Sequence, residues 1–366
     1  MDTITHYDNH NWERESVSLL ALSSIKGIGY WTLFKLASIG INFNSVIKAD
    51  SFDEFKEYFA KAGCRVPNKP DTEWQEYQKL VWREGNELYK RVKQLGARII
   101  HFNEPDFPDS LRNIQEPPRW LFVQGDISVL KRPKITIVGT RKPSEDGIIL
   151  ANYVGSCIPF FNAATVSGLA TGIDQIIHNM SIRFEVPTIA VLGNGVLVNY
   201  PAGSEQLRED VAAYGGVVLT EYLPEQSYSA ENFVRRNRIQ AGLGNVLVPV
   251  EWKARSGTSH TVRYASAGNK PIFCLRMPDW LDKDHNELNL ARELGGKDYI
   301  YPIESNQFIE DIYYGIHKNS ISKIQSESRK DYQEKKLQKH EEMPYKNKPI
   351  ATSEEERQLD IWADIN

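Results

Sequence analysis

From Arg98 onward, short runs of β-branched residues alternate with stretches of helical character, and this alternation limits the possible fold more than any other feature of the chain. The runs are nearly continuous in Val, Ile and Leu, as expected for strands that helices cover on both faces. Strands that alternate with helices are typical of a parallel sheet. We therefore expect an α/β fold with a doubly wound, mostly parallel sheet, with strands at residues 98–101, 120–123, 135–138, 164–167, 188–192, 217–220, 246–250 and 272–275.

The 366 residues exceed one ordinary domain, and changes in composition and periodicity along the sequence suggest how they are divided. Residues 16–96 place apolar side chains at helical spacing around the turn Ile25-Lys26-Gly27-Ile28-Gly29, which predicts a small all-helical domain. Residues 97–318 contain the expected strands. Residues 1–15 are expected to form a flexible leader and residues 319–366, which are polar, a disordered tail.

Composition excludes several classes of protein. Hydrophobic residues make up 41% of the chain, and no apolar run approaches the roughly 18 residues of a membrane helix. The N-terminus has no basic region followed by an apolar stretch, so we expect a cytoplasmic protein without a membrane partner. Cys64, Cys157 and Cys274 are far apart, which predicts three core thiols and no metal site. The net charge of −4 does not indicate a nucleic-acid binder, although an overall sum can conceal a local basic face.

Two loops that follow expected strands have the character of anion-binding turns, although a simple strand-to-helix turn also fits each glycine. The first is Gly139-Thr140-Arg141-Lys142-Pro143-Ser144, where the glycine permits close approach and the amides before the next helix can face an anion, with Arg141 available to hold it. The second runs from Ser167 and Gly168 to Asp174, with small residues, hydroxyls and amides before a helix. Neither loop has the pattern G-x-G-x-x-G, and no acidic residue follows about 20 residues later to bind a ribose. We therefore expect no nicotinamide, flavin or other cofactor.

Two weaker patterns leave their alternatives open. Asp174 and His178 are four residues apart and share a helix face, a spacing that suits a metal pair or an acid–base pair. No third ligand or nucleophile joins them in sequence, so a structural role is favoured. The turn from Ile25 to Gly29 resembles a helix-hairpin-helix, whose amides can contact a DNA phosphate, but a simple helix connector fits equally well.

The strongest local signal is the stretch from Asn232 to Arg263, which contains six Lys or Arg residues and one acidic residue, Glu251. Guanidinium groups of arginines near the ends of a buried strand can form paired hydrogen bonds with the phosphates of a nucleic-acid backbone. Phe233 offers an aromatic face on which an unstacked base can lie. Although a basic run is often only a solvated surface, this one predicts a site for single-stranded nucleic acid.

The motifs of the chain, taken in order, resemble those of the DprA/Smf family of bacterial DNA-processing proteins over residues 16–280. The resemblance is specific because many motifs occur in one order: Phe107-Pro108-Asp109-Ser110-Leu111, Ile137-Val138-Gly139-Thr140-Arg141-Lys142-Pro143-Ser144, Ser167-Gly168-Leu169-Ala170, Gly172-Ile173-Asp174, Tyr200-Pro201, Glu221-Tyr222, Asn232-Phe233, Arg235-Arg236-Asn237-Arg238 and Arg255-Ser256-Gly257-Thr258.

The resemblance implies an extended Rossmann-like domain behind a SAM-like helical domain. It also implies a homodimer that binds and protects single-stranded DNA and helps load the RecA recombinase in natural transformation, without catalysis. Carried over by motif, the DNA-binding residues are Gly139, Thr140, Arg141, Lys142, Ser167, Gly168, Asn232, Phe233, Arg235, Arg236, Asn237, Arg238, Arg255, Ser256, Gly257 and Thr258.

The chain departs from the family pattern at Thr171, where relatives carry an arginine, and matches it only loosely over Gly257 to Thr261. Two alternatives therefore remain. The first is a nucleotide-binding protein or a phosphoribohydrolase on the same fold, although the Pro-Gly-Gly-x-Gly-Thr-x-x-Glu segment of that enzyme family is missing. The second is a related protein specialised for phage defence.

Overall fold

The computed structural model of the protein describes residues 9–318. Its first part is all-helical, as predicted, and its helices enclose an apolar core that includes Leu19, Leu33, Phe55 and Phe59. The same core takes in Trp120 and Tyr222 from the α/β part, so the two parts pack together within one compact unit. The helices are α1 (Asn9–Ser24), α2 (Tyr30–Ser38), α3 (Phe43–Ile47), α4 (Phe52–Lys61) and α5 (Trp74–Gln94).

Helix α1 begins at Asn9 and thus includes residues 9–15, which we expected to belong to a flexible leader. The reason is a tertiary contact of Glu15. Its buried carboxylate accepts hydrogen bonds from the backbone amides of Phe43 at 2.7 Å and Asn44 at 3.0 Å, at the start of α3. The prediction of a leader was therefore wrong for residues 9–15, and residues 1–8 lie outside the described part of the chain.

Glu15 is expected to make stability depend on pH. Burial raises the pKa of its carboxyl from 4.5 to about 7, although the two amide hydrogen bonds oppose that shift. A raised pKa in the folded state means that stability present at low pH is lost as the pH rises through 7. Between pH 5 and pH 8, chemical denaturation should report a loss of up to about 3 kcal/mol that Glu15→Gln abolishes. An identical pH profile in wild type and variant contradicts this assignment.

The α/β part contains a seven-stranded sheet with strand order β1-β2-β6-β5-β4-β3-β7. Strands β3 to β7 pair in parallel, whereas β1 and β2 are antiparallel additions at one edge. The predicted doubly wound, mostly parallel sheet is thus confirmed. Its strands are β1 (Ala97–His101), β2 (Trp120–Gly125), β3 (Lys134–Gly139), β4 (Ala164–Ser167), β5 (Thr188–Val191), β6 (Val217–Thr220) and β7 (Val246–Val250).

A second, two-stranded parallel sheet continues beyond β7 and makes the fold an extended version of the Rossmann type. It consists of β8 (Phe273–Arg276) and β9 (Lys297–Ile300), and a single parallel bridge from Ile272 to Leu247 joins it to the edge of β7. The eight expected strands are all present, but β9 was not predicted.

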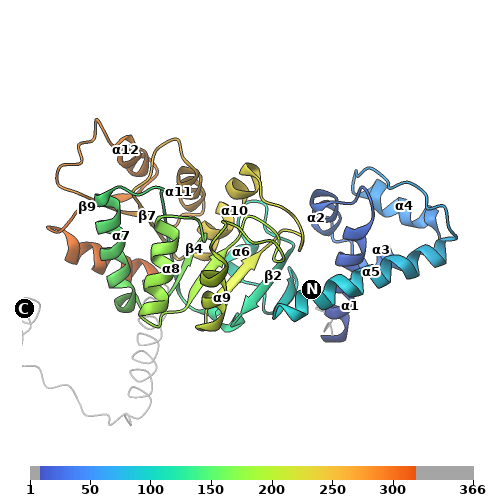
Figure 1. The fold of residues 1–366 in the computed structure, drawn as a ribbon. Helices are drawn as coiled ribbons and strands as arrows, with labels where there is room; N and C mark the ends of the chain where they lie inside the picture. The colour runs from blue at the N-terminus through green and yellow to red at the C-terminus, as the bar shows by residue number, and fades with distance from the viewer. Residues whose placement is uncertain (1–8, 319–366) are drawn as a thin grey trace, which may run out of the picture. The chain divides into compact units, whose positions relative to one another are not determined.

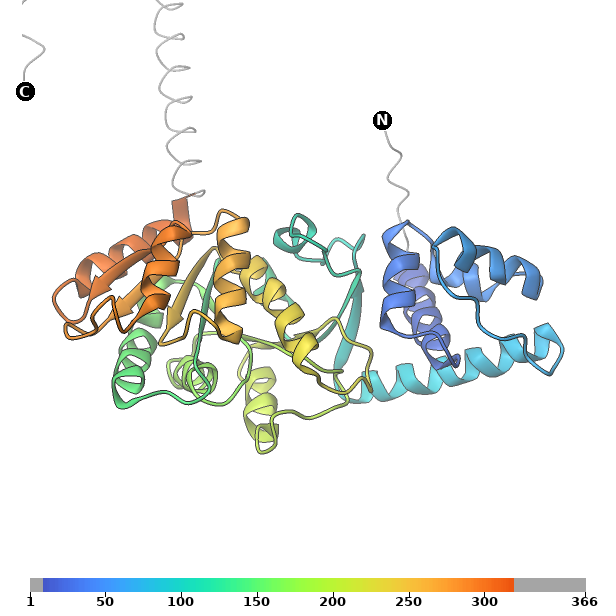
Figure 2. The ribbon, with the colours of Figure 1, turned by 90° about the horizontal axis from the view of Figure 1, so that it is seen from above.

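Helices cover both faces of the sheet (Figures 1 and 2). Because side chains alternate along a strand, Ile135 and Ile137 of β3 pack against α7 and α8, while Val138 packs against α10 and α11 on the opposite face. The larger helices of this part are α7 (Glu145–Cys157), α8 (Ile173–Arg183), α9 (Glu205–Ala213), α10 (Ala230–Leu243), α11 (Gly257–Ala267) and α12 (Asn286–Glu293). Short helices also occur at Asp109–Arg112 (α6), Ile127–Lys131 (η1) and Ile158–Phe161 (η2), and a further helix spans residues 305–318.

Strand β3 lies between β4 and β7, where the order of the strands reverses direction. In an open α/β sheet this reversal leaves a crevice at the carboxyl ends of the strands, which is the usual position of a ligand site. The fold therefore directs attention to the loops after β3 and β7.

Three expectations about the chain as a whole can be compared with the structure. Cys157 and Cys274 are buried free thiols, but Cys64 is only half-buried, so the prediction of three core thiols was wrong for Cys64. No helix within residues 9–318 is long and apolar enough to cross a membrane. The predicted tail at residues 319–366 lies outside the described residues.

Candidate functional site

A cavity of about 630 Å³ opens at the carboxyl ends of β3 and β7, in the predicted crevice. Its volume lies within the range of small-molecule and nucleotide sites. The walls come from α10, the first turn of α11 and the segments that follow β3, β4, β5, β6 and β7. They include Gly139, Thr140, Arg141, Ala170, Asp174, Tyr200, Tyr228, Ser229, Phe233, Arg236, Asn237, Gln240, Trp252, Lys253, Ser256, Gly257 and Thr258.

Three aromatic rings form one side of the cavity. The ring centroid of Tyr200 lies 4.0 Å from that of Tyr228 and 5.1 Å from that of Phe233. The guanidinium of Arg141 lies 5.1 Å from the Phe233 ring, within cation–π range. Gly193 backs this wall, since a Cβ there would come within 2.4 Å of Phe233. Tyr228 is 49% exposed, so the wall remains accessible to a ligand.

The first turn of α11 forms the positive end of the cavity. Ser256 precedes this helix without capping it through its side chain, which leaves the amides at the helix N-terminus available to an anion. Two hydrogen bonds hold the turn in place: Asn237 Nδ2 donates to the carbonyl of Gly257 at 2.9 Å, and Thr258 Oγ1 donates to the carbonyl of Gly139 at 3.1 Å. The exposed Lys253 adds a positive charge. This end of the cavity suits a phosphate.

Carboxylates of the chain itself bind amides in both predicted anion-binding turns. Glu251 Oε2 accepts a hydrogen bond from the amide of Ser144 at 2.8 Å, at the start of α7. Asp174 Oδ2 accepts one from the amide of Gly168 at 3.1 Å. The structure therefore does not support free phosphate sites at these amides, because each already has an internal anion. Arg141 remains exposed at the cavity, so it is the side chain of the first loop that serves the site.

The guanidinium of Arg236 supports the cavity from inside the protein. It is buried and donates to the carbonyls of Gly168 and Val191, at the ends of β4 and β5. Burial lowers its pKa to about 10, partly offset by the carboxylate of Asp174. Gly168 has to lack a side chain here, because a Cβ would approach Arg236 Nη1 to 2.2 Å. Arg236 thus joins α10 to the central strands.

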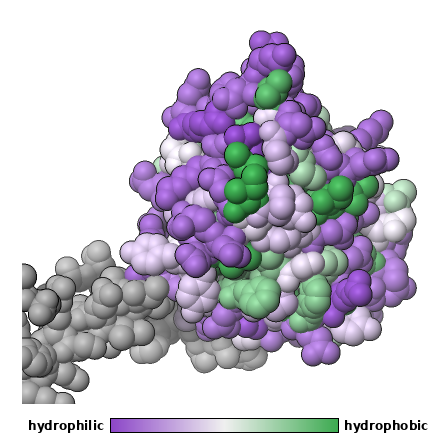
Figure 3. Space-filling model, turned by 90° about the vertical axis from the view of Figure 1, so that its left-hand side faces the viewer, coloured by the Kyte–Doolittle hydropathy of each residue, from purple (hydrophilic) through white to green (hydrophobic). Residues whose placement is uncertain are grey.

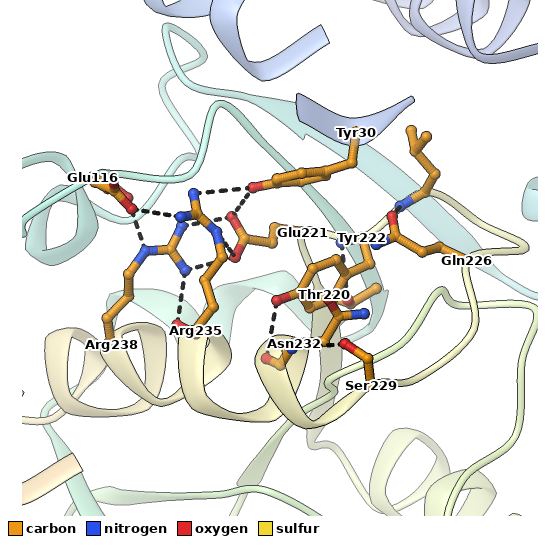
Figure 4. A network of polar contacts seen from close by, with 11 residues as sticks. Tyr30, Glu116, Thr220, Glu221, Tyr222, Gln226, Ser229, Asn232, Arg235 and Arg238 are labelled. Carbon is orange, nitrogen blue, oxygen red and sulfur yellow. Dashed lines mark hydrogen bonds and ion pairs between the residues drawn. The ribbon is translucent and has the colours of Figure 1, made fainter. Parts of the chain in front are cut away.

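Arg235 and Arg238 project from α10 away from the cavity, which corrects their placement in one DNA pocket. Figure 4 shows both side chains directed toward Glu221 and Glu116. Arg238 forms a two-pronged ion pair with Glu221, with both N–O distances at 2.6 Å, and Arg235 Nη1 donates to Glu116 Oε2 at 2.5 Å. The hydroxyl of Tyr30 donates to Glu221 Oε2 at 2.6 Å. These arginines therefore dock the N-terminal helices onto α10.

The spacing along α10 explains this division. Phe233, Arg236 and Asn237 are three and four residues apart and share the face that lines the cavity, whereas Arg235 and Arg238 share another face. A helix cannot present three arginines at these positions to one ligand.

Five other predicted residues do not line the cavity. Gly168 lies behind it, where its carbonyl accepts a hydrogen bond from Arg236. Ser167 is buried, and its hydroxyl donates to the carbonyl of Ile137. Asn232 is half-buried, and its side-chain amide donates to the carbonyl of Ser227. Lys142 and Arg255 are exposed in the loops that flank the cavity. Of the predicted set, the cavity thus brings together Gly139, Thr140, Arg141, Phe233, Arg236, Asn237, Ser256, Gly257 and Thr258.

Asp174 and His178 have structural surroundings. Burial raises the pKa of Asp174, and burial lowers the pKa of His178 to about 3. His178 Nδ1 lies 2.8 Å from Thr188 Oγ1, inside the fold. A neutral, enclosed imidazole agrees with the structural role that the sequence favoured.

Sequence reasoning missed several residues of the site. Tyr228, Trp252 and Lys253 line the cavity, but only Lys253 had been noted, as part of the basic stretch. Tyr200 appeared only within the family motif Tyr200-Pro201. Tyr228 follows a polar loop with no periodic pattern, so no signal in a single sequence marked it.

Comparison with known proteins identifies the α/β part. Residues 98–292 match the family model of DNA recombination-mediator protein A. The Smf protein of Synechocystis is 32% identical over 221 residues, which are 58% of this chain and 55% of that protein. The DNA processing protein DprA of Bacillus subtilis is 34% identical over 184 residues, 50% of this chain and 62% of that protein. The chain therefore spans a little over half the length of these relatives.

Solved structures agree with this assignment. DNA processing protein A from Streptococcus pneumoniae superposes with a TM-score of 0.58 at 26% identity, covering 78% of this chain and 94% of that chain. The same protein from Helicobacter pylori superposes with a TM-score of 0.52 at 24% identity, covering 60% of this chain and 97% of that chain, and shows the same fold. Because the family model covers more than half of its length, the chain belongs to the DNA recombination-mediator protein A family.

Proposed function

We propose that this protein binds single-stranded DNA in the cavity between β3, α10 and α11 and thereby acts as a recombination mediator. The observation that carries the proposal is the pairing of Phe233 with Arg141 in the same cavity as the uncapped first turn of α11. An aromatic face binds an unstacked base, and a helix N-terminus with nearby cations binds the phosphates that connect such bases. The solved structure from Helicobacter pylori, described as having a single-stranded DNA binding mode, supports the proposal.

The preference for a single strand follows from the same geometry. In duplex DNA the bases are paired and stacked, so their faces are not available to Phe233 and Tyr228. A cavity of about 630 Å³ accommodates an unstacked nucleotide but not a duplex.

Fluorescence anisotropy with a labelled oligonucleotide, single-stranded or duplex and at two salt concentrations, tests the proposal. We expect preference for the single strand, with log affinity falling by about 0.7 per phosphate contact for each unit of log salt. Equal affinity for duplex DNA, or no binding at low salt, contradicts it.

The finer steps of this role are also proposals. We infer from the family resemblance that the protein forms a homodimer, helps to load RecA onto the DNA that it holds, and does so during natural transformation. Exposed apolar residues on α7, Ile148 and Ile149, offer a dimer some surface to bury. Figure 3 shows the end of the molecule near β9 and α7, where apolar groups lie among hydrophilic ones. Sedimentation velocity tests the dimer, and a RecA strand-exchange assay tests the loading step. A monomer in sedimentation contradicts the dimer, and strand exchange that the protein does not stimulate contradicts the loading step.

We propose that the protein acts by binding, without catalysis. The acid–base candidates support this view, since Asp174 is bound to the amide of Gly168 and His178 to Thr188. The competing function is hydrolysis of a nucleotide in the same cavity. Release of a free base from a panel of nucleoside monophosphates establishes that enzyme, and intact nucleotides throughout the panel exclude it for those substrates.

Thr171→Arg is expected to strengthen DNA binding. Thr171 is exposed beside Ala170, which lines the cavity. The family resemblance implies an arginine at this position in relatives. One added phosphate contact should steepen the salt dependence by about 0.7 in log–log slope and lower Kd at low salt. Thr171→Gln has a similar reach without the charge and serves as the control. If log affinity falls with log salt at the same slope in both variants, no DNA phosphate lies next to residue 171.

A further inference from the structure

Helix α2 carries an aromatic and basic surface that the proposed function does not use. Trp31 is 46% exposed and is the one exposed tryptophan among residues 9–318. The half-buried ring of Phe34 lies beside it, with centroids 5.8 Å apart. We call this surface, formed by Trp31, Phe34, Lys35 and Arg119, the α2 platform.

The α2 platform is positively charged within an acidic chain. Residues 16–49 contain three lysines and no acidic residue, although the whole chain has a net charge of −4. Lys26 and Lys35 of this segment are exposed. The guanidinium of Arg119 lies 5.9 Å from the Phe34 ring, and its Nε donates to Ser38 Oγ at 3.1 Å. The acidic group at this surface, Glu116, is paired with Arg235.

Arg235 connects the α2 platform to α10. Its guanidinium lies 4.2 Å from the Trp31 ring and 5.0 Å from the Phe34 ring, so one cation serves both aromatics. The ion pair of Arg238 with Glu221, together with the hydroxyl of Tyr30, holds the first turn of α2 in this position (Figure 4). The aromatic part of the α2 platform is thus held in place by buried contacts.

The α2 platform and the cavity adjoin the same turn of α10. Phe233 and Val234 line the cavity, and the next residue, Arg235, contacts Trp31. A strand that leaves the cavity across this turn meets a second aromatic face with cations around it. Exposed aromatic faces in a cationic groove, repeated along a path, are the arrangement by which proteins bind successive bases of single-stranded nucleic acid.

We propose that the α2 platform is a second contact for single-stranded DNA, in which Trp31 stacks with a base while Lys35 and Arg119 face the phosphates. This inference rests on the proposed function, because it extends the bound strand beyond the cavity. It assigns to the N-terminal helices a binding role through the side chains of α2 rather than through the amides of the preceding turn.

The test compares a long single-stranded oligodeoxythymidine with the shortest one that the wild type still binds. Trp31→Ala should raise Kd for the long oligonucleotide by roughly 5- to 150-fold, the effect of losing one stacked base, and leave the short one unchanged. Trp31→Phe, which keeps an aromatic face, should restore part of the affinity. Leu80→Ala on α5, where Leu80 is 40% exposed, is the matched control and should change neither value.

A second variant keeps the test decisive if Trp31→Ala destabilises the fold. Lys35→Glu changes only an exposed side chain. It should weaken binding of the long oligonucleotide and make that binding less dependent on salt. Wild-type affinity of both Lys35→Glu and a folded Trp31 variant for the long oligonucleotide overturns the α2 platform. Failure of the wild-type protein to bind either oligonucleotide instead overturns the proposed function on which the platform rests.

Discussion

Glu221→Ala is expected to lower the free energy of unfolding by about 3–5 kcal/mol, the usual effect of removing one partner from a buried ion pair. Glu221 is fully buried and accepts hydrogen bonds from Arg238 and Tyr30. Without its carboxylate, the guanidinium of Arg238 stays buried with an uncompensated charge, and the Tyr30 hydroxyl loses its acceptor. Urea denaturation followed by circular dichroism measures the loss.

The neighbouring carboxylate provides a matched control. Glu116 also pairs with an arginine of α10, but its side chain is 55% exposed. Solvent screens such a pair, so Glu116→Ala should cost less than about 1 kcal/mol. Similar losses for the two variants contradict the view that Glu221 is the buried centre of the contact between the N-terminal helices and α10.

Phe233→Ala is expected to weaken single-stranded DNA binding by roughly 5- to 150-fold, because it removes an aromatic face from the wall of the cavity. Phe233 is half-buried and contacts Tyr200, Arg141 and the backbone at Gly193. The loss should therefore appear in Kd for short and long oligonucleotides alike. Fluorescence anisotropy at one salt concentration measures it, with thermal unfolding to confirm that the variant is folded.

Phe233→Tyr keeps the aromatic ring and is expected to bind within a few-fold of wild type. An Arg141→Gln variant should in contrast flatten the salt dependence, since it removes a charge and leaves the ring. If a folded Phe233→Ala protein binds with full affinity, no base stacks on Phe233. Binding would then depend on charge alone.

The sequence predicts most of this fold because the central strands have a strong signal. Strands β3, β5 and β7 are nearly continuous apolar runs, interrupted in β3 and β5 only by Lys134, Thr136 and Thr188, since helices cover both of their faces. Strand β9 escaped prediction for the opposite reason. It is only Lys297–Ile300, with one buried side chain and two charged residues, and its pairing with β8 depends on tertiary contact.

The candidate site was predictable as a set of loops but not as a set of contacts. The three arginines of α10 form one basic cluster in sequence, yet helical spacing places Arg236 toward the strands and Arg235 and Arg238 toward α2. Their partners lie far away in the chain: Glu116 is separated from Arg235 by 119 residues and Tyr30 from Glu221 by 191. A single sequence carries no information about such pairs.

Glu251 illustrates the same limit. In the sequence it stands out only as the one acidic residue of the basic stretch. The structure places its carboxylate on the amide of Ser144, where an external phosphate had been expected. The charge balance of the site therefore depends on which internal anions satisfy which amides, and that is decided by the fold.

The most direct test of the central claim is photochemical cross-linking of a single-stranded oligonucleotide that contains 5-iododeoxyuridine, followed by mass spectrometry of the linked peptides. Halogenated pyrimidines cross-link on irradiation to aromatic side chains that lie against them. We predict cross-links to Phe233, Tyr228 or Tyr200, the rings that line the cavity. Cross-links confined to peptides outside the cavity and the α2 platform, in protein that binds the oligonucleotide tightly, contradict the proposed site.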